Sequence, residues 1–225
     1  METSPLASAV VFHLGPLGIT RPVVTTWALG AVLAFLAALA TRRVPAGGRR
    51  EAVLEIVVTG LLGQIEAVIR GDGRRLLPLL GTLFVFLAVA NLSGVLPGVQ
   101  APTARLETPA ALAVIVFFAV HYYGVRAQGL RGYLASFAKP KAVMLPLNLL
   151  SEVTRTFSLM VRLFGNVMSG EFVIGLVVAL AGLLVPIPLM ALEVLLGLVQ
   201  AYIFTVLATV FIGAAMGDAA PPPGR

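Results

Sequence analysis

The sequence predicts an all-α polytopic membrane protein. Of its 225 residues, 59% are apolar and only 12% are charged, whereas about a quarter of the residues of soluble domains are charged. The mean hydropathy is +0.99, and several apolar runs are long enough to cross a bilayer as helices. This composition excludes a disordered chain, a coiled coil and nearly every water-soluble domain.

Five apolar runs are predicted to be transmembrane helices, because roughly 20 helical residues span the hydrocarbon core. They cover residues 23–41, 76–96, 110–123, 143–184 and 189–216. Arginines, glycines and prolines separate these runs and end each helix. The fourth run is much longer than one perpendicular crossing requires, and polar residues interrupt it.

The segment between the first two runs, residues 50–70, is predicted to be one interfacial amphipathic helix. Its apolar residues recur at spacings of three and four, and Glu51, Glu55, Gln64 and Glu66 interrupt them. Such a pattern is typical of a helix that lies in the membrane surface. A weak sixth crossing is the alternative interpretation.

The two ends of the chain lie outside the predicted helices, and residues 1–225 as a whole are expected to form a single membrane domain. Residues 1–22 are expected to form an outer N-terminal segment. They lack the basic region of a signal peptide, so we expect them to be kept. The Pro-rich tail 219–225 is expected to be disordered.

Basic residues predict the orientation, because the cytoplasmic loops of membrane proteins are rich in Lys and Arg. Seven basic residues lie in residues 41–75 and four in residues 124–142, but only Arg21 and Arg105 lie on the opposite side. The N-terminus is therefore predicted outside and the C-terminus in the cytoplasm, with the chain in the plasma (inner) membrane. Because these loops account for the net charge of +6, we do not expect nucleic acid as a partner.

Metal and thiol chemistry are not expected. Cysteine is absent and the two histidines are far apart in the sequence. Disulfides, thiolate metal sites and thiol nucleophiles are therefore excluded. We expect no bound metal and no cofactor.

Two arginines lie inside the fourth predicted span. An arginine at the bilayer centre costs about 2.5–3.5 kcal/mol on insertion scales, and such residues usually serve a function. Arg162 has apolar-biased helix on both sides, which favours a functional role. Arg155 stands nearer the cytoplasmic end, where snorkelling to the interface is an alternative to an auxiliary role.

Helical geometry places polar neighbours around these arginines. At 100° per residue, Arg155 and Arg162 share one face, and Asn166 joins it. Glu171 points to the other side of the helix. Glu152 is three residues before Arg155 and can pair with it across one turn.

The last predicted span carries Glu193 and Gln200 on one face. If residues 143–216 form an antiparallel helical hairpin, Gln200 reaches the depth of Arg162, and Glu193 reaches that of Glu171. Three further polar residues lie on the other side of the arginine: Asn148, Ser151 and Glu152. Polar groups on both sides of one fixed charge indicate two separate aqueous half-pathways rather than a single pore.

Three motifs carry a resemblance to a known family. The run at 162–171, RLFGNVMSGE, resembles the signature of subunit a of F-type ATP synthases. The run at 200–207, QAYIFTVL, matches the family's last helix, and residues 91–98, NLSGVLPG, are a third match. Pro-Thr-Ala at 102–104, which follows the third motif, is a weaker match. The resemblance covers most of the chain from about residue 50 onward.

The resemblance implies roles for the polar residues of the last two spans. Arg162 matches the family's essential stator arginine. Asn166 and Glu171 match polar residues of the outer half-channel, and Gln200 matches the glutamine that faces the arginine. Glu193 stands where the family often has His or Glu.

The resemblance also implies the assembly. The last two long helices would form a tilted hairpin against a rotor ring of c subunits, with b-type peripheral stalk subunits, membrane lipid and, indirectly, an ATPase head as further partners. Such a chain is an ion-translocating stator subunit and not an enzyme on its own. The resemblance leaves open whether the coupling ion is H⁺ or Na⁺.

The chain departs from the family's pattern at three positions. Arg105 and Glu107 replace acidic and amide residues after Pro-Thr-Ala, and Thr156 stands where a proline is common. A stand-alone secondary transporter or channel is an alternative, although no internal inverted repeat is evident. A purely structural membrane subunit is a third interpretation, and the intramembrane Arg162 argues against it.

Overall fold

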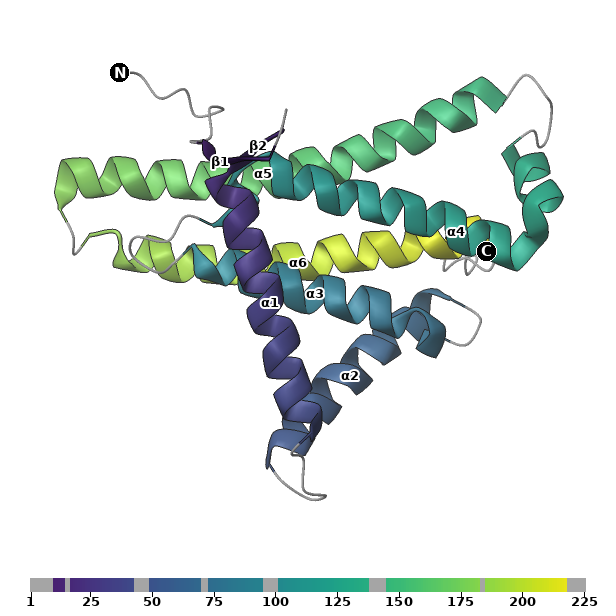
Figure 1. Cartoon of the computed structure of the whole chain (residues 1–225), viewed down its shortest axis with the longest axis horizontal. Coiled ribbons are helices and arrows are strands. Elements are labelled where there is room, and N and C mark those ends of the chain that lie inside the picture. The colour runs from purple at the N-terminus through teal and green to yellow at the C-terminus, as the bar shows by residue number, and fades with distance from the viewer. Residues whose placement is uncertain are drawn as a thin grey trace, which may run out of the picture. The chain divides into compact units, whose positions relative to one another are not determined.

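The computed structural model describes residues 10–14, 17–42, 49–69, 73–94, 101–137, 145–182 and 185–217. The predicted tail 219–225 lies outside these residues. The elements are β1 (Val10–Leu14), β2 (Leu17–Thr20), α1 (Arg21–Arg42), α2 (Arg49–Val68), η1 (Gly73–Arg75), α3 (Leu77–Ser93), η2 (Pro102–Ala104), α4 (Glu107–Phe137), α5 (Leu145–Ala181) and α6 (Ile187–Met216) (Figure 1).

The fold is that of an all-α polytopic membrane protein, as predicted. Within the described residues, α4, α5 and α6 are long and apolar enough to cross a membrane, and Val23–Ala38 and Leu77–Ser93 are shorter apolar helices. Each of the five predicted runs is therefore helical in its described part. Helix α2 corresponds to the predicted interfacial segment, and its position at the membrane surface stays a prediction.

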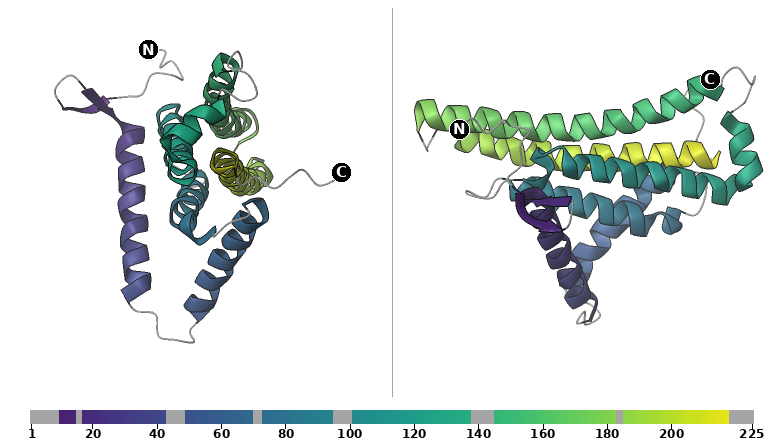
Figure 2. Two further views of the ribbon diagram at one scale, coloured as in Figure 1. Left: turned by 90° about the vertical axis from the view of Figure 1, so that its right-hand side faces the viewer. Right: turned by 45° about the horizontal axis from the view of Figure 1, so that its top comes forward.

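A short β-hairpin precedes α1, where the sequence predicted only an outer segment (Figure 2). Strand β1 pairs antiparallel with β2, with Phe12 opposite Ile19 and Leu14 opposite Leu17. The strands contain β-branched and aromatic residues, which favour a pleated backbone. This two-stranded element is an addition to the predicted all-α architecture.

Helix α4 extends beyond its predicted end at residue 123. The prediction that residues 124–137 belong to a loop is therefore wrong, because they form the second part of α4. Gly129 has φ 73°, a left-handed conformation that interrupts the helix and that glycine adopts at little cost. Figure 1 shows the chain turning at this end of α4. The second helical part packs back on the first, because a Cβ atom at Gly124 would lie 2.5 Å from the Tyr133 ring.

Helices α5 and α6 are each followed by a glycine that ends the helix. Gly182 follows α5 with φ 78°, and its N–H donates to the carbonyl of Val178 at 3.1 Å. Gly217 follows α6 with φ 79°. Both are the left-handed glycine caps that terminate helices. At 37 residues, α5 is longer than a perpendicular crossing needs, as predicted.

The chain forms two compact units. Unit 1 comprises residues 1–45, 85–111 and 160–202, and unit 2 comprises residues 46–84, 112–159 and 203–225. Each of the helices α3 to α6 contributes one part to each unit. Buried side chains of unit 1 include Leu87, Leu163 and Val167, and those of unit 2 include Leu80, Val120, Phe204 and Ile212.

Candidate functional site

Asn91 is the centre of a hydrogen-bonded group in unit 1. It lies near the end of α3 and is 6% exposed. Its Nδ2 donates to the carbonyl of Gly197 at 2.8 Å, and its Oδ1 accepts from the hydroxyl of Thr103 at 2.8 Å. A Cβ atom at Gly197 would lie only 3.0 Å from that of Asn91, so the close approach of α3 and α6 depends on this glycine. The buried amide thus joins α3, η2 and α6.

Glu171 is joined to the segment that contains η2. Its Oε1 accepts a hydrogen bond from the backbone N–H of Ala101 at 3.0 Å. The guanidinium of Arg105 is near enough to interact electrostatically with this carboxyl group. Arg105, at which the chain departs from the family's pattern, therefore lies near Glu171, a predicted site residue.

Glu193 lies beside Gly170 of the neighbouring helix. A Cβ atom at position 170 would overlap the carboxyl group of Glu193, which would then have to move. The carboxyl groups of Glu193 and Glu171 are close enough to interact electrostatically. This is the proximity that the antiparallel arrangement of the last two helices predicted.

A cavity of about 210 Å³ lies within unit 1, and we call it the Glu193 cavity. Its polar wall is formed by Asn91, Asn166, Ser169 and Glu193, and glycines and aliphatic side chains form the rest. Glu171 is not one of the lining residues. The sequence predicted Asn166 and Glu193 as site residues, but it gave Asn91 only as part of a motif and did not predict Ser169 as a site residue.

Arg162 is exposed on α5. Within the described part of the chain, no ion pair or hydrogen bond holds its side chain, and Nε2 of Gln200 is buried without a hydrogen-bond partner. The structure therefore does not bring Gln200 into hydrogen-bonding contact with Arg162, and their predicted meeting stays a prediction. The apolar stretch of α5 is only 11% buried, compared with 44% for α4 and for α6.

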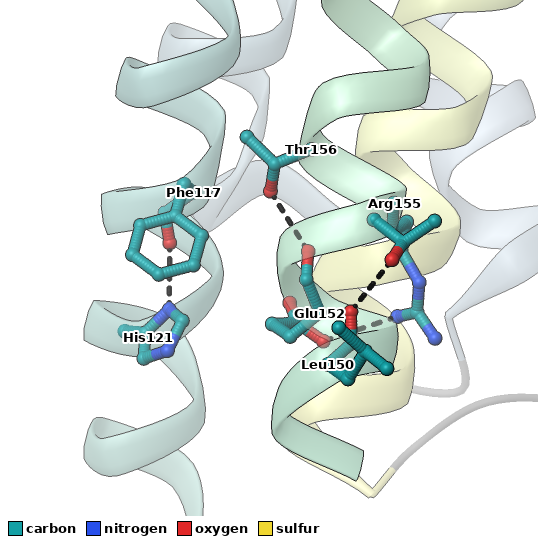
Figure 3. Close-up of polar contacts among 7 residues, drawn as sticks. Phe117, His121, Leu150, Glu152, Arg155 and Thr156 are labelled. Atoms are coloured by element: carbon teal, nitrogen blue, oxygen red, sulfur yellow. Dashed lines mark hydrogen bonds and ion pairs between the residues drawn. The ribbon is translucent and has the colours of Figure 1, made fainter. Parts of the chain in front are cut away.

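Glu152 and Arg155 form the ion pair that their spacing predicted (Figure 3). Nη1 of Arg155 lies 3.5 Å from Oε2 of Glu152. The guanidinium carbon also lies 4.6 Å from the centre of the Phe211 ring, within the range of a cation–π interaction. Glu152 is buried, whereas Arg155 is partly exposed. The pair belongs to unit 2.

A second cavity, of about 200 Å³, lies within unit 2, and we call it the Glu152 cavity. It brings together four predicted residues, Asn148, Ser151, Glu152 and Arg155. Tyr133, Ser136 and Phe137 of α4 and Phe211, Ala214 and Ala215 of α6 complete the wall. Nδ2 of Asn148 donates to the carbonyl of Phe137 at 2.8 Å, which fixes α5 to the end of α4. The sequence missed the α4 residues because they fell in a predicted loop.

The two cavities contain the same kinds of polar group. Each cavity has a carboxyl group and amide or hydroxyl groups that donate and accept hydrogen bonds. In the order of the sequence, the α5 residues of the Glu152 cavity come before Arg162, and those of the Glu193 cavity come after it. Inside a membrane, such ionisable groups mark ion pathways.

Fold and site together define a polytopic membrane protein of ion transport, with an exposed arginine on α5 and two cavities that each contain a carboxyl group. The sequence profile of the family described as ATP synthase A chain matches residues 23–213. The chain therefore belongs to this family, as a membrane-sector subunit of ATP synthase that is not catalytic by itself.

Curated relatives agree with this assignment over nearly the whole chain. ATP synthase subunit a 2 of Bradyrhizobium sp. strain BTAi1 is 72% identical over 98% of this chain and 99% of its own length. ATP synthase subunit a of Albidiferax ferrireducens is 47% identical over 99% of this chain and 97% of its own length. ATP synthase subunit a 1 of Hahella chejuensis is 46% identical, covering 97% of this chain and 93% of the relative.

Proposed function

We propose that the chain is the ion-translocating stator subunit of a rotary F-type ATP synthase, with Arg162 as its essential charge. The observation that carries this proposal is an exposed arginine on α5, the least buried of the three long apolar helices α4, α5 and α6. A guanidinium keeps its charge under all working conditions. Such a permanent cation on an uncovered membrane helix suits a partner that brings carboxylates past it.

Arg162 acts on the carboxylates of a rotor ring in this mechanism. At about 4 Å and an effective dielectric constant near 20, its attraction for a deprotonated carboxylate is roughly 4 kcal/mol. The same charge repels a cation that would pass directly from one side to the other. The ion therefore has to travel with the ring, and this couples ion flow to rotation.

Two half-channels lead to the ring on either side of Arg162. The outer one uses Asn166, Glu171, Glu193 and Gln200, and the cytoplasmic one uses Asn148, Ser151 and Glu152, with Arg155 as an auxiliary charge. Their support is that Asn166 and Glu193 line one cavity, whereas Asn148, Ser151, Glu152 and Arg155 line another. Neither cavity shares a lining residue with the other.

The partners follow from this role. The exposed apolar face of α5 suits a ring of c subunits and lipid; it includes Leu149, Val153, Phe157, Val161, Phe172 and Leu176. Peripheral stalk subunits of the b type and, indirectly, the ATPase head complete the complex. The basic loops support a plasma-membrane location with the N-terminus outside and the C-terminus in the cytoplasm.

Replacement of Arg162 by alanine in the whole complex tests the proposal. The Arg162→Ala complex should assemble but lose both ion-driven ATP synthesis and ATP-driven pumping in proteoliposomes. A passive ion leak is expected, because a rotor carboxylate then meets both half-channels without rotation. Arg155→Ala is the matched control and should be much milder, because Arg155 is partly exposed and already paired. Normal coupling in Arg162→Ala, or an equal defect in the control, would contradict the proposal.

A further inference from the structure

Two neighbouring tyrosines of unit 2 lie where the apolar part of α4 ends. Tyr122 and Tyr123 are the last residues of the apolar run 110–123, and Arg126 follows one turn later. The two rings meet edge to face, with their centroids 5.3 Å apart. Tyrosine is enriched at membrane surfaces, because its ring is apolar and its hydroxyl group is polar. The pair therefore indicates that this end of α4 lies at a membrane surface.

Arg126 is held by one of these tyrosines and not by an acidic residue. Its Nη1 donates to the hydroxyl oxygen of Tyr122 at 2.9 Å. Among the residues that the structure describes, no carboxylate forms an ion pair with Arg126, and its side chain is exposed. The Tyr122 hydroxyl group still has its own proton to donate, and the guanidinium still has its other N–H groups. Donors arranged in this way suit an anion with several oxygens, such as a phosphate group.

Tyr123 joins the same end of α4 to η1. Its hydroxyl group donates to the backbone carbonyl of Arg75 at 3.4 Å. Arg74 and Arg75 are both exposed, so η1 adds positive charge near the tyrosines. Glu66 of α2 also lies beside η1 and offsets part of that charge. Arg126 is therefore the principal cation here. We call Tyr122, Arg126 and η1 together the Arg126 site; all of it belongs to unit 2.

An exposed apolar stripe of α4 leads away from the Arg126 site. Ile115, Phe118 and Tyr122 are all exposed, and their spacings of three and four place them on the face that carries Arg126. From Ile115 to Arg126 the helix rises about 16 Å. This is roughly the depth of one leaflet, because the whole hydrocarbon core is about 30 Å thick. A phospholipid has the same layout, with a charged group at one end and an apolar chain beyond it.

We infer that the Arg126 site binds the head group of an anionic phospholipid, whose acyl chain lies along Phe118 and Ile115. The charges are complementary, since basic groups at a membrane surface attract anionic head groups. A zwitterionic lipid would bring its own ammonium group close to the arginine, and free phosphate would leave the apolar stripe unused. The lipid site is independent of the role that we propose for Arg162.

Photo-crosslinking in the whole complex tests this inference. The complex is placed in phosphatidylcholine nanodiscs that contain a small share of phosphatidylglycerol with a photoreactive acyl chain. Mass spectrometry then locates the labelled residues. Residues 115–126 should be labelled more strongly by this lipid than by photoreactive phosphatidylcholine at the same share. Equal labelling by the two lipids would overturn the inference.

Arg126→Ala should lower the labelling of residues 115–126 by phosphatidylglycerol about fivefold, the effect expected of one basic side chain at an anionic surface. Labelling by phosphatidylcholine should not change. Arg131→Ala is the matched control, because it removes the same charge from an exposed position of α4 beyond Gly129. Equal losses in the two variants would mean that net charge alone attracts the lipid, and this would overturn a defined site.

Tyr122→Phe separates a built site from a charged surface, and it decides the matter if Arg126→Ala does not assemble. It keeps the ring and every charge, but it removes the hydroxyl group that holds Arg126. Labelling by phosphatidylglycerol should fall about threefold or more, since a hydrogen bond to a charged group is lost. Undiminished labelling in Tyr122→Phe would contradict the site.

Two further outcomes identify a different occupant. Inorganic phosphate added at millimolar concentration should not displace the photoreactive lipid, because the apolar stripe contributes to the binding of the lipid alone. If it does displace the lipid, the site binds free phosphate and the inference is wrong. If no lipid labels residues 115–126 and a chemical cross-linker joins them to another subunit, the face is a protein interface and the inference is likewise wrong.

Discussion

The Glu193 cavity and the Glu152 cavity are similar in volume but differ in the state of their carboxyl groups. Glu152 is paired with Arg155 at 3.5 Å, and Phe211 covers the guanidinium. Within the described residues, Glu193 has no such cation and no hydrogen-bond donor. The difference teaches that two cavities of similar size can hold a carboxyl group either in a local ion pair, as for Glu152, or without one among the described residues, as for Glu193.

The largest effect is expected for Arg162→Lys, which keeps the formal charge that separates the two cavities in our proposal. Lysine carries a compact ammonium group that can be neutralised when it is desolvated, whereas a guanidinium cannot. Ion-driven ATP synthesis of the whole complex should therefore be lost, as with alanine. Arg155→Lys is the control and should remain near normal. Sustained coupling in Arg162→Lys would show that charge alone, without its permanence, is sufficient.

Cysteine substitutions sharpen the comparison, because they test from which side of the membrane reagents reach each cavity. The chain has no native cysteine, and Ser169 and Ser151 line one cavity each. Silver ions or maleimide added outside should inhibit the Ser169→Cys complex, and reagents added on the cytoplasmic side should inhibit Ser151→Cys. Reaction of both cysteines from one side only would contradict two half-channels.

A smaller effect is expected for Gly170→Ala, which makes the Glu193 cavity tighter without changing its charges. The added methyl group overlaps the Glu193 carboxyl group, which has to move. We expect ATP synthesis to fall by roughly tenfold, since displacements of about 1 Å at a reacting group have effects of this order or larger. Gly165→Ala, where a Cβ atom meets nothing within 4 Å, is the matched control. Equal activity of the two variants would show that the position of Glu193 is not critical.

The smallest effect on activity is expected for Gly124→Ala, beside the Glu152 cavity. This substitution should lower the stability of the protein more than it affects ion transfer. The new methyl group would lie 2.5 Å from the Tyr133 ring and 3.2 Å from Ala215. Overpacking of this kind costs about 1–3 kcal/mol. Thermal unfolding of the purified complex should shift to lower temperature, whereas Gly132→Ala, with only an ordinary contact at 3.5 Å, should not show this loss. An unchanged unfolding temperature in Gly124→Ala would mean that Tyr133 moves freely.

Local geometry explains what the sequence predicted correctly. The pair of Glu152 and Arg155 follows from a spacing of three residues on one helix, which needs no knowledge of the rest of the fold. The proximity of Glu171 and Glu193 required one further assumption, that the last two helices run antiparallel.

The missed features depend on contacts between segments far apart in the chain. Tyr133 reaches the Glu152 cavity only because Gly129 turns the end of α4 back and Gly124 leaves room for the ring. Neither the turn at Gly129 nor the close contact at Gly124 produces a hydrophobic periodicity in the sequence from which it could be predicted. The bond from Ala101 to Glu171 joins residues 70 positions apart and uses a backbone donor, which any residue except proline can supply.

The hydrogen bonds around Asn91 run in a single direction. The hydroxyl of Thr103 donates to the amide oxygen, and the amide nitrogen donates to the carbonyl of Gly197. Each bond in such a chain polarises the next, and only one orientation of the amide satisfies both neighbours. An ionised aspartate would repel the Gly197 carbonyl, and leucine would leave both partners unsatisfied. Position 91 therefore requires a side chain that gives and takes a hydrogen bond at once, and at this size that means asparagine.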